Sequence, residues 1–424
     1  MKDSPPTLRQ DLRLLILEDF SFTANGGIET VRLSLVPEFA RLCPVVWTLP
    51  QSRISNTIKK LSSLNGIVFE ALNPSRFTIS WYIARLSKTI SKVENLFPYG
   101  SFSVQISAWS KRVHLESIIK KHRITHLLNL GVFDQPILTL SVPVFGIVYD
   151  INYQPSIRTN CMNNLLFWLQ KAAGIIAVSN FSRDQIVTSF PSRNCLVHSV
   201  PIAVTPPPHL SPVEGRLDEL NQPIFFYPAS FNIHKNHGLL LRALALVYEQ
   251  GYSFKMVFCG AYTQLLTGSR ILQDYQLEDA RLFLANSSSE FRSCIQAYGA
   301  VEQSHVEDLF QQATCILLPT SYEGFGLPLT EAALRGIPVI CSDIPPFQEQ
   351  VSLYNLKNGV TFVNDSTPHA WSISIINTLN DLEQLSNPDE ENKHAWKRWT
   401  WQDVANSYIS ILQPGLPRSS ATNL

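Results

Sequence analysis

Two glutamates, Glu323 and Glu331, lie eight residues apart around a pair of glycines in the stretch 315–343. A carboxylate only accepts hydrogen bonds, whereas the hydroxyls of sugars and of ribose donate them. Gly324 and Gly326 allow the backbone to approach a ligand without a Cβ atom in the way. Two carboxylates flanking a glycine turn therefore indicate one sugar-like group on each side of a phosphate, which describes a nucleotide-sugar. The alternative is an ordinary α/β turn with two solvated glutamates.

The elements around this turn are predicted as strand, glycine turn, helix and strand. The apolar run Cys315–Leu318 has the length of a buried strand, and the next strand is expected at 338–341. Pro328 suits a first helical turn because it has no N–H group to leave unpaired. We expect the helix to run from Leu327 to about Arg335 and to end at Gly336. The free N–H groups of its start are predicted to bind phosphate.

Lys235 is the candidate cation for the same chemistry. It follows the predicted strand 224–227 and a turn, at the start of a predicted helix. A fixed ammonium there would neutralise a departing diphosphate, which is where charge develops in glycosyl transfer. A loop lysine is more often simply solvated, and this reading stays open.

A second glycine turn, Gly26-Gly27, lies between the predicted strand 12–17 and a predicted helix from Ile28 to Leu42. A glycine pair between a first strand and a first helix is a common place for a diphosphate. A plain tight turn would explain the same residues.

The string EGFGLPLTEA resembles the E-x7-E signature of retaining GT-B glycosyltransferases of the glycosyltransferase family 4 type (glycosyl transferases group 1). That family includes bacterial polysaccharide mannosyltransferases and glucosyltransferases. The resemblance extends through LLPTSYEGFGLPLTEAALRGIPVICSDIPPFQEQV; it is strong over 224–412 and weaker but continuous over 12–204. It implies that Glu331 holds the ribose and that Glu323 lies near the donor hexose and its phosphates. It also implies donor contacts from residues of both glycine turns: Gly26, Gly27, Gly324, Phe325, Gly326 and Leu327.

The string YPASFNIHKNHGLLLRAL resembles the phosphate-binding segment of the family and implies a donor-binding role for Lys235. Ser230 stands where many members have an arginine, so the second positive charge must come from elsewhere, such as His234 or a helix start. Tyr149 stands where members often have a histidine that hydrogen-bonds the donor sugar, and Asp150 follows it. A phenol with a pKa near 10 is a poor general base at neutral pH, and Tyr149 would serve equally well as a structural strand-end residue.

Length and pattern predict two domains. A chain of 424 residues with 45% hydrophobic residues is too long for one ordinary core. Strand-like and helical segments alternate in both halves, which indicates an α/β fold with mostly parallel sheets. With the resemblance, we expect a GT-B fold of two Rossmann-like, doubly wound domains facing each other across a cleft. The predicted parts are an acceptor-side domain 1–204, a Pro-rich linker 205–222, a nucleotide-sugar domain 223–394, and a closing helix with a tail, 395–424.

The composition of the chain restricts the classes of partner and the compartment that we expect for it. A net charge of zero gives no electrostatic case for nucleic acid. The seven cysteines form no CxxC pair, which favours thiols in a reducing compartment. Residues 76–123 carry nine basic side chains against two acidic ones, with aromatic residues interleaved, a pattern that suits an anionic membrane surface or an ordinary solvated helix. We find no secretory segment and no apolar run long enough to span a bilayer. The prediction is a cytoplasmic protein at the inner face of the membrane, with no cofactor and no metal.

With the resemblance, the sequence predicts a retaining hexosyltransferase, with mannose slightly preferred as the sugar and a glycan or lipid-linked acceptor in surface polysaccharide synthesis. Lys235 and the glycine turns would hold the leaving diphosphate in a front-face displacement. One alternative is a catalytically weak or inactive partner subunit that keeps the nucleotide pocket, because Ser230 and Tyr149 depart from the family pattern. Another is a retaining glycosidase that uses Glu323 and Glu331 as a carboxylate pair about 5 Å apart.

Overall fold

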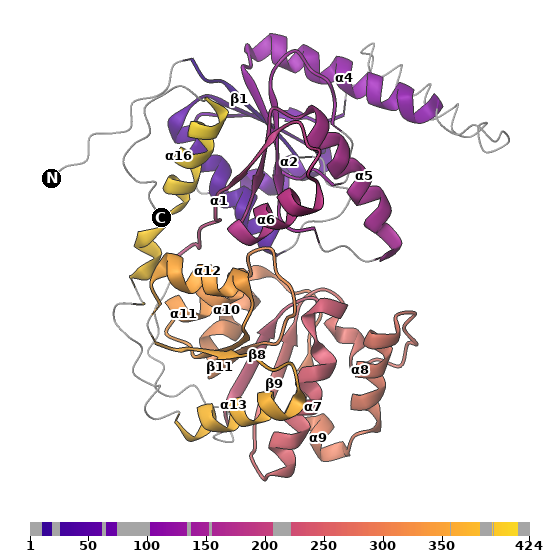
Figure 1. Ribbon diagram of the computed structural model, residues 1–424, viewed down its shortest axis with the longest axis vertical. Helices are drawn as coiled ribbons and strands as arrows, with labels where there is room; N and C mark the ends of the chain where they lie inside the picture. The colour runs from indigo at the N-terminus through magenta and orange to yellow at the C-terminus, as the bar shows by residue number, and fades with distance from the viewer. Residues whose placement is uncertain are drawn as a thin grey trace. The chain divides into compact units, whose positions relative to one another are not determined.

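The computed structural model describes residues 11–18, 26–61, 65–73, 102–133, 137–151, 155–206, 222–356, 358–381, 392 and 394–413. The chain divides into two compact units (Figure 1): a first unit of Met1–Ile202 with Trp401–Leu424, and a second unit of Ala203–Thr400. The division places residues 395–400, predicted as part of the closing segment, in the second unit. Most of the predicted linker, residues 207–221, lies outside the described ranges.

The described residues of the first unit form a seven-stranded parallel sheet in the order β3-β2-β1-β4-β5-β6-β7. In this doubly wound order the chain turns back between β1 and β4, which is the switch point where α/β proteins bind ligands. The strands are β1 (Leu14–Leu17), β2 (Val45–Leu49), β3 (Ile67–Ala71), β4 (His126–Asn129), β5 (Val144–Val148), β6 (Gly174–Ala177) and β7 (Leu196–Ser199).

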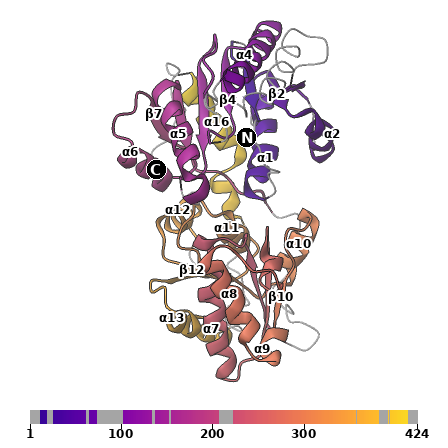
Figure 2. The ribbon, with the colours of Figure 1, turned by 90° about the vertical axis from the view of Figure 1, so that its right-hand side faces the viewer.

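Helices cover both faces of this sheet (Figure 1): α1 (Gly27–Leu42), α2 (Gln51–Lys60), α4 (Phe102–His122), α5 (Pro155–Lys171), α6 (Asn180–Ser189) and α16 (Trp401–Leu412). Helix α1 buries Val31, Leu35 and Phe39, whose spacing places them on one face. The last helix, α16, runs beside α1 (Figure 2), and the rings of Phe39 and Tyr408 lie 5.8 Å apart.

The second unit repeats the same order in a six-stranded parallel sheet, β10-β9-β8-β11-β12-β13, among its described residues. Its switch point lies between β8 and β11, which are hydrogen-bonded neighbours. The strands are β8 (Ile224–Pro228), β9 (Lys255–Cys259), β10 (Ile295–Ala297), β11 (Cys315–Leu318), β12 (Val339–Ser342) and β13 (Val360–Val363).

The helices of the second unit are α7 (His237–Glu249), α8 (Tyr275–Asn286), α9 (Ser289–Ser293), α10 (Gln303–Gln312), α11 (Leu327–Leu334), α12 (Pro345–Tyr354) and α13 (Pro368–Asn380), with 3₁₀ turns at Ile233–Lys235, Thr263–Leu265 and Ala395–Arg398. The short apolar run 282–284 resembles a strand in the sequence but lies inside α8, where Leu284 is buried from one face of the helix.

Candidate functional site

The glycine turn of the second unit connects β11 to α11 at the switch point. Gly326 has φ +91°, a conformation that residues with a Cβ rarely adopt, and it precedes the first helical residue. A Cβ on Gly326 would lie 2.5 Å from a ring carbon of Phe347. Glycine is therefore required here both by the backbone conformation and by the lack of space for a Cβ atom. The N–H groups at the start of α11 come directly after Gly326 in the chain.

Gln350 of α12 holds this turn in place. Its Nε2 donates to the carbonyl oxygens of Phe325 (2.5 Å) and Gly326 (3.2 Å), and its Oε1 accepts from the Thr330 hydroxyl at 2.5 Å. Gln350 is fully buried. Sequence reasoning missed it, although a glutamine on the buried face of a helix is a usable signal.

Lys235 and Glu323 are brought together by the two strands that flank the switch point. Lys235 follows β8 and Glu323 follows β11, and these strands pair in parallel, so their carboxyl ends share one edge. The Lys235 ammonium lies 2.5 Å from a Glu323 carboxylate oxygen. Both side chains are largely buried, at 15% and 16% exposure. The cation and the first glutamate of the predicted site thus form an ion pair.

Backbone contacts join the two turns that carry this pair. The His234 carbonyl accepts from the backbone N–H of Ser321 at 2.8 Å and lies 3.0 Å from the hydroxyl of buried Thr320. Asn236 Nδ2 donates to the Pro319 carbonyl at 2.9 Å. The Lys235 carbonyl accepts from Tyr227 at 2.8 Å. Lys235 and Glu323 are therefore held by a cross-linked pair of turns.

His234 does not supply a second positive charge to this site. Burial, with the neighbouring Lys235 ammonium, lowers the pKa of His234 to about 4, so its imidazole is neutral at pH 7. Ser230, which follows β8 on the same turn, is partly buried and uncharged. Of these three residues, Lys235 alone carries a positive charge toward the turn.

His237, at the start of α7, lies beneath this turn in an aromatic cluster. Its ring centroid is 4.9 Å from that of Tyr227, 5.1 Å from Phe231 and 5.3 Å from Phe258. Burial, together with the charge of the neighbouring Lys235 ammonium, lowers the pKa of His237 to about 3. The neutral imidazole therefore packs as an aromatic ring that supports the Lys235 segment.

Glu331 lies on α11 and presents an acceptor. Burial raises the pKa of its carboxyl, the Arg335 guanidinium lowers it, and Glu307 raises it. Arg335 is engaged by Glu307, 2.6 Å away, and by the Glu331 carbonyl at 2.7 Å. Within the described ranges no hydrogen bond reaches the Glu331 carboxylate. The predicted role of this glutamate as an acceptor for a ligand hydroxyl stays a prediction.

Other residues of the predicted turn contribute through the backbone only. The side chains of Phe325 and Leu327 are buried in the core, so their contacts with a ligand are limited to main-chain groups. Gly324 is buried in the same turn.

The remaining predicted residues lie in the first unit. Gly26 has φ +97° and precedes α1, of which Gly27 is the first residue. Tyr149 and Asp150 follow β5 and are partly exposed, but the Tyr149 hydroxyl is buried. Burial raises the pKa of Tyr149 well above its usual value, Glu18 raises it further, and Arg32 lowers it. Tyr149 is therefore a neutral phenol and not a general base.

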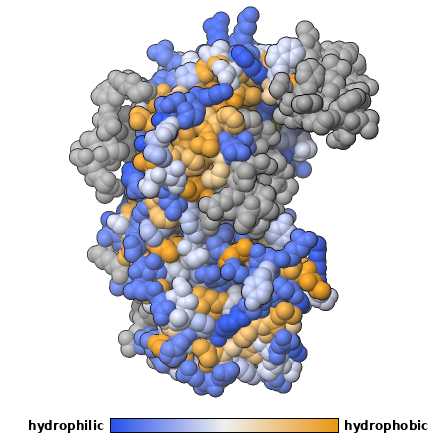
Figure 3. Space-filling view, turned by 45° about the vertical axis from the view of Figure 1, so that its right-hand side comes forward, coloured by the Kyte–Doolittle hydropathy of each residue, from blue (hydrophilic) through white to orange (hydrophobic). Residues whose placement is uncertain are grey.

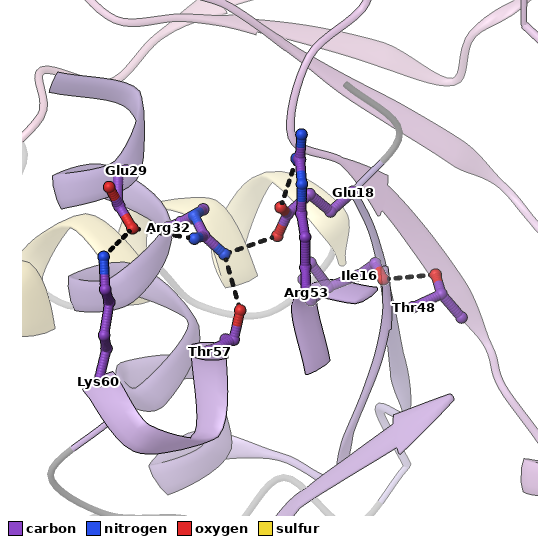
Figure 4. Close-up of polar contacts among 8 residues, drawn as sticks. All are labelled: Ile16, Glu18, Glu29, Arg32, Thr48, Arg53, Thr57 and Lys60. Carbon is purple, nitrogen blue, oxygen red and sulfur yellow. Dashed lines mark hydrogen bonds and ion pairs between the residues drawn. The ribbon is translucent and has the colours of Figure 1, made fainter. Parts of the chain in front are cut away.

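The first unit also contains a buried ion-pair network that sequence reasoning did not predict (Figure 4). Glu18, at the end of β1, is fully buried and accepts from Arg32 of α1 (3.1 Å) and Arg53 of α2 (3.3 Å). Arg32 also donates to Thr57 at 3.2 Å and to Glu29 at 3.2 Å. The available signal was Arg32 on the apolar face of α1, in helical register with Leu35 and Phe39.

Two negative findings, on metal-binding groups and on membrane-spanning helices, apply to the described residues alone. No group of three or more His, Cys, Asp or Glu side chains there is placed to hold a metal ion, and the predicted metal independence stays a prediction. No helix there has both the length and the apolar character needed to cross a bilayer.

Comparison with known proteins gives a family match to the second unit. Residues 215–395 match the sequence model of the family described as glycosyl transferases group 1. O-antigen chain mannosyltransferase RfbU of Salmonella typhimurium is 29% identical over 139 residues, covering 33% of each chain. O-antigen chain mannosyltransferase B of Escherichia coli is 25% identical over 263 residues, covering 60% of this chain and 66% of the relative. The matches thus span one third to two thirds of these relatives.

The solved structures match over nearly the whole chain. A glycosyltransferase from Rickettsia africae superposes with a TM-score of 0.60 at 15% identity, covering 95% of this chain and 98% of that one. At this identity the likeness concerns the fold, and the two parallel α/β units confirm the predicted GT-B fold.

Proposed function

We propose that this protein, whose residues 215–395 match the family of glycosyl transferases group 1, transfers a hexose from a nucleotide-sugar to a glycan or lipid-linked acceptor, with retention of configuration, in surface polysaccharide synthesis. One observation carries the proposal. A lysine–glutamate pair, a second glutamate and a helix start preceded by a glycine turn meet at the switch point of the second sheet. Ligands of doubly wound sheets bind at this point.

The charges of the site fit a nucleoside diphosphate sugar. The Lys235 ammonium and the N–H groups at the start of α11 suit the two phosphates, where negative charge builds up as the glycosidic bond breaks. The Glu331 carboxylate is free to accept from a ribose hydroxyl. Glu323 holds Lys235 and orients the donor hexose.

Retention follows in this proposal from front-face displacement. Glu323 is engaged by Lys235, which makes it a poor covalent nucleophile, and Tyr149 remains protonated. The departing diphosphate would then take the proton of the acceptor hydroxyl on the face from which it leaves. An inverted anomer in the product would contradict this mechanism.

A mannosyl donor is the preferred specificity. Both curated relatives reported above are named as O-antigen chain mannosyltransferases, which supports mannose as the sugar and an O-antigen-like glycan as the acceptor. Guanine is the matching base.

A catalytically weak or inactive nucleotide-binding partner subunit is the second candidate. The turn after β8 favours this candidate. Because Ser230 is uncharged and His234 is neutral, Lys235 is the only one of these three residues that can stabilise the diphosphate by its charge. Weaker stabilisation of the leaving group would slow transfer and leave binding intact.

Contact with an anionic membrane belongs to the same proposal. Of the predicted segment 76–123, only residues 102–123 are described. Helix α4 exposes Trp109 (53%) along with Arg112 and Lys120, and α5 exposes Phe167 (51%). Figure 3 shows apolar residues gathered on one face of the first unit. Exposed aromatic residues beside basic ones suit an interface with anionic headgroups at the cytoplasmic side.

The test is a transfer assay with GDP-mannose, GDP-glucose, UDP-glucose and UDP-galactose, with lipid-linked glycan as acceptor, read by release of the nucleoside diphosphate and by NMR of the product anomer. Release with one donor, dependent on acceptor and with a retained anomer, supports the proposal. Binding of a nucleotide without release from any donor supports the inactive subunit instead. Glu249→Ala, at an exposed position on α7, serves as the control variant.

A further inference from the structure

Arg335 directly follows the last residue of α11 and stands four positions after Glu331. A glutamate followed by an arginine at this spacing ordinarily forms a favourable ion pair, because the two side chains lie on the same face of the helix. Arg335 does not use this partner in the described structure. Its Nη1 donates to the main-chain carbonyl of Glu331 at 2.7 Å, and none of its hydrogen bonds within the described ranges goes to the Glu331 carboxylate.

Glu307 of α10 engages the guanidinium of Arg335 instead. Its Oε1 accepts from Arg335 Nε at 3.1 Å and from Nη2 at 2.8 Å, and its Oε2 accepts from Nη2 at 2.6 Å. Phe310 follows Glu307 by three positions on α10, and its ring centroid lies 4.8 Å from the guanidinium carbon. A planar guanidinium is suited to both contacts, with the carboxylate at its edge and the ring at its face. Two residues on one face of α10 therefore hold Arg335.

Burial makes this arrangement sensitive to the loss of Glu307. The side chain of Arg335 is 9% exposed and that of Glu307 is 17% exposed, while Phe310 is buried. A largely buried guanidinium that loses its carboxylate is costly, so it turns to another carboxylate within reach. Glu331 meets this condition, because it stands one helical turn before Arg335 on α11. Without Glu307, the ion pair between Arg335 and Glu331 should form.

We propose that Glu307 is a positioning residue for Glu331. By holding Arg335 against Phe310, it keeps the guanidinium away from the Glu331 carboxylate, which stays available to accept hydrogen bonds from the sugar hydroxyls of a nucleotide. The identity of that ligand rests on the proposed function. The choice between two carboxylates by Arg335 does not rest on it, because this choice is a property of the protein alone.

Glu307→Ala tests the proposal by the sign of its effect on nucleotide binding. Removal of a negative charge should by itself strengthen the binding of an anionic nucleoside diphosphate. We expect the reverse: for whichever of GDP and UDP binds the wild type, the calorimetric Kd should rise about tenfold, because Arg335 occupies the Glu331 carboxylate. Glu302→Ala is the matched control, since it removes an exposed carboxylate at the start of the same helix, and it should bind as the wild type does. An unchanged or lower Kd in Glu307→Ala would overturn the proposal.

The double variant Glu307→Ala/Arg335→Met separates positioning from a loss of structure. Methionine keeps an unbranched apolar side chain beside Phe310 but cannot pair with Glu331. The double variant should therefore regain the Kd of the wild type to within about twofold, and Arg335→Met alone should bind as the wild type does. Urea unfolding of all the variants shows that each is folded in the binding buffer. A double variant that binds as weakly as Glu307→Ala would reduce Glu307 to a structural role and overturn the proposal.

A crystal structure of Glu307→Ala gives a result that needs no nucleotide. The guanidinium of Arg335 should lie within hydrogen-bond distance of the Glu331 carboxylate. An Arg335 that stays on Phe310 without contacting Glu331 would overturn the proposal, even if binding is weakened. A wild type that binds neither GDP nor UDP would contradict the proposed function instead, and the crystal structure would still show which carboxylate Arg335 takes.

Discussion

The Lys235 ammonium lies 2.5 Å from the Glu323 carboxylate, although the two residues are 88 positions apart in the sequence. Their strands, β8 and β11, are neighbours at the switch point of the second sheet. The ion pair holds the cation at the edge where the glycine turn begins, before any ligand arrives. A bound diphosphate must either contact the Lys235 ammonium together with Glu323 or displace Glu323 from it. In both cases donor binding is coupled to the position of the Glu323 carboxylate.

Replacement of Lys235 by Met should lower kcat for transfer by about 100-fold or more, because a preorganised charge at the leaving group is lost. Lys235→Arg retains the charge with a different geometry, so its kcat should lie between that of the wild type and that of Lys235→Met. Steady-state kinetics with the preferred donor measure the effect. Lys397→Met, at an exposed position of the same unit, is the control. An unchanged kcat in Lys235→Met would remove Lys235 from the mechanism.

Gly326→Ala should destabilise the second unit by about 2–3 kcal/mol, because a Cβ would clash with Phe347 and the backbone has a positive φ. Gly251→Ala separates the two causes: Gly251 has φ +87° but open space around its Cβ position, so it should cost only about 1 kcal/mol. Urea unfolding of both variants gives the comparison. Equal losses would mean that the contact with Phe347 relaxes without cost.

Thr320→Val should weaken nucleotide binding by up to about tenfold. The substitution keeps the shape of the side chain but removes the hydroxyl that lies 3.0 Å from the His234 carbonyl and links the turns of Lys235 and Glu323. Calorimetry measures the affinity. Wild-type affinity in Thr320→Val would show that the other contacts between the turns, which include Ser321 N to His234 O and Asn236 Nδ2 to Pro319 O, are enough to hold them together.

Stability of the second unit should decrease in acid because of His234 and His237. Their folded pKa values, about 4 and about 3, lie below the ordinary value of 6.5, so the unfolded chain takes up protons first as the pH falls. Each histidine then contributes a loss of up to about 1.4 kcal/mol per pH unit between pH 6.5 and its folded pKa. His237→Phe should reduce the slope of unfolding free energy between pH 7 and 5. An unchanged slope would show that folding does not lower the pKa of His237.

The strands and helices could largely be predicted from the sequence, because buried parallel strands are continuous apolar runs and helices carry apolar residues at every third or fourth position. The strand predicted at 315–318 has the same bounds in the structure, where it is β11. The strand predicted at 338–341 is shifted by one residue, to Val339–Ser342.

The candidate site was predictable as a set of residues but not as a set of contacts. The glycine turn and Lys235 each follow a strand, which is a local signal. The pairing of Lys235 with Glu323 depends on which strands become neighbours, and spacing in the sequence does not give this. The neutral state of His234 depends on burial, which also follows only from the assembled fold.

Calorimetric titration of GDP and of UDP into the wild type and into Glu331→Ala tests the central claim most directly. The account predicts that one of the nucleotides binds with a micromolar Kd and that Glu331→Ala weakens its binding by about 1.5–3 kcal/mol, the contribution of a hydrogen bond to a charged group. Glu249→Ala should bind as the wild type does. Binding of neither nucleotide, or equal affinity in Glu331→Ala and the wild type, would contradict a nucleotide-sugar site on α11.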